Sequence, residues 1–97
     1  MTIFLKKFGT TLISRQAGKE SFAALQPNLV KIKPKEHINI DFEGVITFSP
    51  SWGDEFLTPL AEKYGSDRII LKHTENPSVD LTLQLLEKIN KIRFHKD

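Results

Sequence analysis

The segment that most constrains the fold is His37–Phe42, where apolar and polar residues alternate. The apolar residues are Ile38, Ile40 and Phe42, and the polar ones are Asn39 and Asp41. In an extended chain, this alternation places the apolar side chains on one face and the polar side chains on the other. A strand covered by helices on both sides is apolar throughout. We therefore expect an α/β fold whose helices pack mainly on one face of the sheet.

The rest of the chain alternates predicted strands with predicted helices. Strands are expected at Ile3–Phe8 and Arg68–Lys72, and a short extended segment at Val45–Phe48. Helices are expected at Arg15–Leu25, ended by Pro27; from the Ser49–Ser51 region to Gly65, kinked or broken at Pro59; and from Asn76 onward. The last helix directs Val79, Leu83, Leu86, Ile89 and Ile92 inward. This order predicts a small, mostly parallel sheet.

Length and composition limit the chain to one domain, residues 1–97. No apolar run exceeds four residues, which predicts neither a membrane span nor a secretion signal, and there is no cysteine. A cytoplasmic location is therefore expected. Charge is segregated along the chain: residues 1–40 carry seven basic and two acidic side chains, whereas residues 41–65 carry one basic and five acidic ones. Such asymmetry can steer association with charged partners, and an uneven distribution of solubilising charge accounts for it equally well.

No constellation typical of an enzyme is visible. Asp54 and Glu55 are neighbours on a predicted helix, so their side chains diverge by about 100° and cannot flank one substrate bond. The three histidines lack metal-ligand spacing, and no glycine-rich phosphate loop is present. We predict no enzymatic activity, no metal and no cofactor.

Two linked motifs carry a family resemblance. Asp41-Phe42-Glu43-Gly44-Val45 is followed by Phe48-Ser49-Pro50-Ser51-Trp52-Gly53-Asp54-Glu55-Phe56. Together with Arg15 and Gly18 in the first helix, this stretch resembles the STAS-like domain family, which is related to sulfate-transporter and anti-sigma-factor-antagonist domains. The resemblance covers about residues 12–90 and implies a bacterial signalling role.

The resemblance implies a phosphorylation candidate, Ser51. In anti-sigma antagonists, the matching serine is phosphorylated by an ATPase-type kinase, and the unmodified protein binds that kinase. A phosphate at a helix start meets free backbone donors, although Asp54 and Glu55 would repel it. Ser49 or Ser51 also suits a helix cap, and capping alone is the simpler role for both.

The expected partner-binding residues surround this helix start: Arg15, Glu43, Gly44, Ser49, Ser51, Trp52, Asp54 and Glu55. For Trp52, the stripe that it forms with Phe56 and Leu60 favours a core position over a partner anchor. The leading hypothesis is a regulatory module that docks a protein partner. A constitutive homodimer is the second, and a nucleic-acid binder that uses the basic first half is the least favoured.

Overall fold

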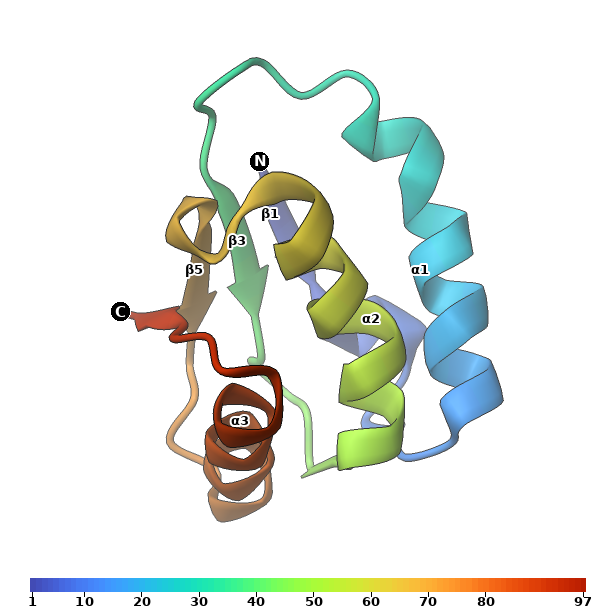
Figure 1. Cartoon of the computed structure of the whole chain (residues 1–97). Helices are drawn as coiled ribbons and strands as arrows, with labels where there is room; N and C mark the ends of the chain where they lie inside the picture. Colours follow the sequence, from blue (N-terminus) through green and yellow to red (C-terminus); the bar gives the residue numbers. More distant parts are fainter.

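The computed structural model of the chain describes residues 1–97 (Figure 1). Its main sheet contains four parallel strands in the order β1-β3-β5-β6. The strands are β1 (Thr2–Phe4), β3 (Ile38–Asp41), β5 (Ile69–Lys72) and β6 (His95–Lys96). The predicted parallel α/β architecture is confirmed, and β6 is an edge strand that the sequence pattern did not indicate.

Three helices cover one face of this sheet: α1 (Arg15–Leu29), α2 (Pro50–Tyr64) and α3 (Pro77–Asn90) (Figure 1). Strand residues that face the helices are buried, including Ile38, Ile40 and Leu71. Residues between them on the same strands, such as Asn39 and Ile70, remain half-exposed. The alternation in His37–Phe42 therefore reports the one-sided layering correctly.

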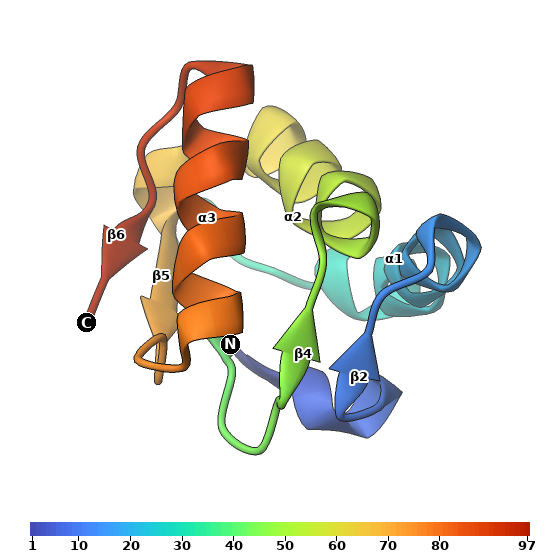
Figure 2. The same cartoon turned by 90° about the horizontal axis from the view of Figure 1, so that it is seen from below.

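A second, two-stranded sheet joins the segments that lead into α1 and α2. It pairs β2 (Thr11–Leu12) in parallel with β4 (Thr47–Phe48). Figure 2 shows these strands side by side, each continuing into its helix. Beyond the strands, the Ser49 amide donates to the Leu12 carbonyl at 2.9 Å. This small sheet therefore brings the starts of α1 and α2 together.

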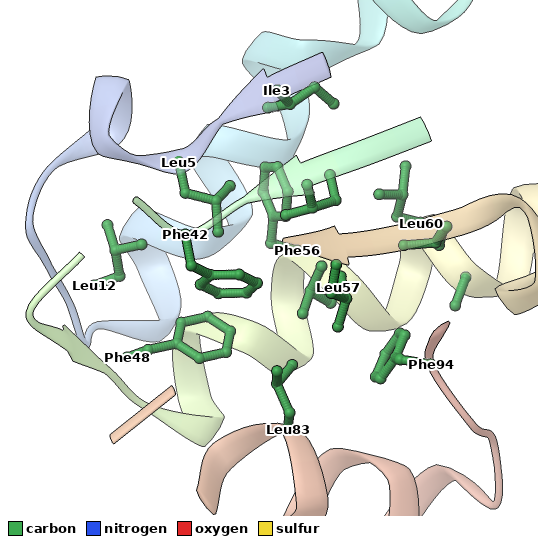
Figure 3. Packing of buried hydrophobic residues seen from close by; sticks show 14 of the residues in the cluster. Ile3, Leu5, Leu12, Phe42, Phe48, Phe56, Leu57, Leu60, Leu83 and Phe94 are labelled. Carbon is green, nitrogen blue, oxygen red and sulfur yellow. The ribbon is translucent and has the colours of Figure 1, made fainter. Parts of the chain in front are cut away.

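The core is a cluster of 21 buried hydrophobic residues drawn from both sheets and all three helices (Figure 3). Aromatic rings run through its centre. Phe42 packs edge-on to Phe48 with centroids 5.0 Å apart, and Trp52 stacks on Phe56 at 4.8 Å. These packed rings fix the first two turns of α2 against the sheet.

The strand predicted at Ile3–Phe8 is wrong in its second half. Leu5–Phe8 forms a 3-10 helix, η1. A strand would direct Leu5 and Phe8 to opposite faces, whereas one helical turn brings residues three apart to the same side. Leu5 is fully buried, and Phe8 lies edge-on to Phe56 with centroids 5.6 Å apart. Burial of these two side chains favours the turn.

Both helices that contain an internal proline run on past it. The end of the first helix predicted at Leu25 is wrong, because α1 continues through Pro27 to Leu29. Leu25 and Leu29 lie one turn apart and are both buried, which offsets the backbone bond that Pro27 cannot make. A break of α2 at Pro59 is also wrong, since α2 reaches Tyr64. No helix of the structure combines the length and apolarity needed to cross a membrane.

Candidate functional site

Ser49 caps α2. It has extended dihedral angles, its hydroxyl oxygen accepts from the Trp52 amide at 3.3 Å, and Pro50 occupies the first helical position. The same hydroxyl donates to the Ile13 carbonyl at 2.8 Å. Of the two serines that suit a cap, the structure therefore selects Ser49. Its hydroxyl is engaged as both donor and acceptor within the chain.

Ser51 lies two residues after Ser49, in the first turn of α2, and is half-buried. It lines an open pocket of about 120 Å³, which lies between the starts of α1 and α2 and the last turns of α3. The lining residues are Arg15, Pro50, Ser51, Asp54, Leu86 and Ile89. The pocket places a free hydroxyl beside a cation, a carboxylate and two aliphatic side chains.

Arg15 connects the two helix starts. Its Nη1 atom lies 3.3 Å from Asp54 Oδ2 and 3.3 Å from Glu55 Oε2. Both carboxylates point to one guanidinium, although they are neighbours on the helix, because the cation reaches across from α1. Asp54 Oδ1 also accepts from the Thr58 hydroxyl at 3.1 Å. These acids serve as ion-pair and hydrogen-bond partners.

Two glycines allow the close packing beneath the site. A Cβ atom on Gly18 would lie 2.6 Å from the Trp52 carbonyl oxygen, and one on Gly53 would lie 2.8 Å from Leu86 Cδ1. The first contact joins α1 to α2, and the second joins α2 to α3. Trp52 itself is 1% exposed, so its ring supports the site from the core and offers a partner no surface.

A second polar cluster forms where β3 and β5 end. The buried Asp41 uses Oδ1 to accept from the Glu43 amide at 2.9 Å and to contact His73 Nδ1 at 2.8 Å. This hydrogen bond, together with the negative charge of Asp41, raises the pKa of His73. Ligand atoms of Asp41, Glu43 and His73 all lie within 4.8 Å of one another. A mixed carboxylate–imidazole set of this kind can hold a divalent transition metal.

The histidine of this cluster is a residue that spacing along the chain could not find. His73 follows Lys72, which is in parallel register with Asp41 across neighbouring strands. Two residues 32 positions apart thus meet through sheet pairing. Glu43 and Gly44 lie in the turn after β3, where Glu43 Oε1 is 3.6 Å from Lys6 Nζ. Neither of them lines the Ser51 pocket.

An exposed apolar border beside the pocket was also missed. The inward placement predicted for Ile89 is wrong, since its side chain is 61% exposed. Leu81 and Leu85 occupy the same side of α3 at four-residue spacing and are 66% and 40% exposed. In contrast, Val79, Leu83 and Leu86 are buried, as predicted. The four-residue spacing of Leu81, Leu85 and Ile89 in the sequence indicates this second apolar stripe, which is separate from the buried stripe on the same helix.

Two residues of α1 thus contact the start of α2. Arg15 pairs with its two acids, and Gly18 packs closely against its backbone. The model of the family described as "STAS-like domain of unknown function (DUF4325)" matches residues 18–79. The chain belongs to this STAS-like family. No curated protein and no solved structure matches it significantly. The matched residues include β3, the α2 start with Ser51, and β5, whereas Arg15, Leu86 and Ile89 of the pocket lie outside them.

Proposed function

We propose that this STAS-like domain is a non-enzymatic regulatory module that docks a protein partner at the start of α2, with an ATPase-type kinase as the favoured partner. One observation carries the proposal. Ser51, which is half-buried and does not cap the helix, lies in an open pocket whose wall includes the apolar residues Leu86 and Ile89. Protein contact surfaces typically combine an apolar centre with polar groups at the rim. The Ser51 surface has both.

The size and chemistry of the pocket favour docking over catalysis. Sites for small molecules typically occupy about 300–1,000 Å³, whereas this pocket has a volume of about 120 Å³. That volume suits one or two side chains of a partner. The carboxylates nearest to Ser51 are paired with Arg15, so no free base stands ready to activate the hydroxyl.

Phosphorylation of Ser51 would change this surface in two ways. A phosphoryl group adds about −1.5 to −2 charges and three acceptor oxygens. It would attract Arg15, which lines the same pocket and is held only by two exposed contacts of 3.3 Å. It would also repel Asp54 and place charge beside Ile89. We therefore expect phosphorylation to weaken docking.

The test incubates the chain with ATP and the ATPase-type kinase that is encoded nearest to its gene. The intact mass of the chain is then measured. The expected result is the addition of one phosphoryl group to the wild-type chain and none to Ser51→Ala. Ser66→Ala is the matched control, because it removes a hydroxyl beyond the far end of α2 and should still be modified. Equal modification of Ser51→Ala and wild type would contradict the switch.

A further inference from the structure

Helix α3 leaves an apolar ridge uncovered on the molecule. The ridge consists of Leu81, Leu85 and Ile89, which are 66%, 40% and 61% exposed. Ile46, which is 63% exposed, lies near the start of the same helix, since the Asn76 side chain donates to the Ile46 carbonyl at 3.1 Å. Single exposed apolar residues are ordinary, but an aligned row marks a contact surface.

The spacing of the ridge identifies the kind of element that fits it. Residues at i, i+4 and i+8 form the ridge that packs into the groove of another helix, with axes crossing at about −50°. No helix of this chain covers the three side chains, since all of them are exposed, whereas α3 itself packs beside α2 and β4 (Figure 2). The ridge is therefore shaped for a helix from outside the chain.

The distribution of charge along α3 indicates which outside helix fits the ridge. Glu75 and Asp80 stand at its start, and Lys88, Lys91 and Arg93 stand at or just beyond its end. None of these five residues forms an ion pair within the chain. In contrast, Glu87 is engaged by Lys96 at 3.3 Å. One end of the segment is thus acidic and the other basic, and no opposite charge of this chain forms an ion pair with these five residues.

We propose that a second copy of this chain covers the ridge, with the two α3 helices antiparallel around a two-fold axis at Leu85. This arrangement sets Leu81 against Ile89 of the second copy and the acidic start of one helix near the basic end of the other. A two-fold contact needs a self-complementary surface, and the ridge meets that condition. A parallel arrangement would oppose like charges at both ends.

This dimer brings a copy of the ridge to the edge of the Ser51 pocket, because Ile89 belongs to both surfaces. Self-association requires no kinase, so it can be tested with the unmodified chain alone. Its failure would leave the docking proposal standing, and loss of kinase docking would leave the dimer standing.

The first experiment measures molar mass by light scattering over a range of protein concentrations. The wild-type chain should have the mass of a dimer. Leu85→Asp should shift it to the monomer and weaken self-association at least about 100-fold, because it buries an unpaired charge at the axis. Val30→Asp is the matched control: Val30 is 74% exposed and lies at the end of α1, so this variant should remain dimeric. Circular dichroism checks that each variant is folded.

The second experiment uses the absence of native cysteine to test the antiparallel geometry. Under mild oxidation, Leu85→Cys should form a covalent dimer. Leu81→Cys and Ile89→Cys should cross-link when mixed, while each alone should remain uncross-linked, because disulfides need Cα atoms within about 7 Å. A monomer at all concentrations, a dimer unaffected by Leu85→Asp, or efficient 81–81 cross-linking would overturn the proposal.

Discussion

At the scale of single residues, Gly18 shows how a position that weakens a helix can be required by its packing. Its hydrogen takes the place where any side chain would meet the Trp52 backbone, at 2.6 Å from the carbonyl oxygen. Backbone atoms of a buried helix turn cannot move aside as a flexible side chain can. The glycine therefore sets the approach of α1 to the α2 start.

Gly18→Ala is expected to destabilise the fold despite the higher helix propensity of alanine. Overpacking of this kind costs about 1–3 kcal/mol, which exceeds the propensity gain of about 1 kcal/mol. Urea unfolding followed by tryptophan fluorescence measures the change. Lys19→Ala, on the exposed side of the same helix, should leave the midpoint almost unchanged. A Gly18→Ala variant more stable than wild type would contradict the close contact.

His73 predicts a defined pH dependence. Asp41 raises its pKa in the folded chain above the ordinary value of 6.5, so the folded state binds the proton more tightly than the unfolded state. This contribution to stability is fully present below pH 6.5 and is lost as the pH rises through the folded pKa. An NMR titration should place the His73 midpoint above 6.5, and Asp41→Asn should bring it back. A wild-type midpoint at or below 6.5 would refute the pairing.

At the scale of elements, the β2–β4 pair explains why residues of α1 and α2 act together. Each strand ends just before its helix, so Arg15 and the acids of α2 arrive on the same side of the molecule. The helices are thereby joined near their starts, with Arg15 bridging them at the surface. We expect this bridge to matter for the surface that a partner meets more than for stability.

Arg15→Ala is expected to lower the free energy of unfolding by less than about 1 kcal/mol, because its ion pairs are solvent-exposed. Arg68→Ala is a matched contrast. Arg68 donates three hydrogen bonds to the backbone carbonyls of Lys33 and Glu36, and its loss should cost about 1–3 kcal/mol. Urea denaturation of both variants compares them directly. An Arg15→Ala effect as large as that of Arg68→Ala would assign Arg15 a structural role.

Local pattern predicted the elements that depend on their own residues. Alternation at Ile38–Phe42 indicated the one-sided sheet, and the Asn76-Pro77 pair indicated the start of α3, which Asn76 caps through the Ser78 amide at 2.7 Å. What escaped prediction depends on contacts between distant segments. Leu5 and Phe8 turn toward a core completed by α2, and His73 meets Asp41 only through strand pairing.

The candidate site shows the same division. Ser49, Ser51 and the two acids of α2 could be identified from the motif, because they occupy the start of one helix. The pocket itself combines three helices, so its aliphatic wall from α3 could not be inferred from that motif. Ile89 lies near the boundary between two stripes of α3, and the pattern alone placed it on the wrong one.

At the scale of the whole molecule, the one-sided sheet gathers the starts of α1 and α2 and the apolar ridge of α3 into adjoining surfaces. Ile89 links the Ser51 pocket to the ridge. One surface is proposed for a regulatory partner and the other for a second copy. The STAS-like domain would thus present two docking surfaces side by side, each with its own chemistry.

Binding of the ATPase-type kinase to the unmodified chain, measured by isothermal titration calorimetry, tests the central claim most directly. Ser51→Glu should weaken binding at least about tenfold, since it places a negative charge in the Ser51 pocket beside Asp54. Ser66→Glu is the control, because it adds the same charge beyond the far end of α2 and should bind like wild type. Equal binding by wild type and Ser51→Glu, or equal weakening by both variants, would contradict the assignment of the α2 start as the docking surface.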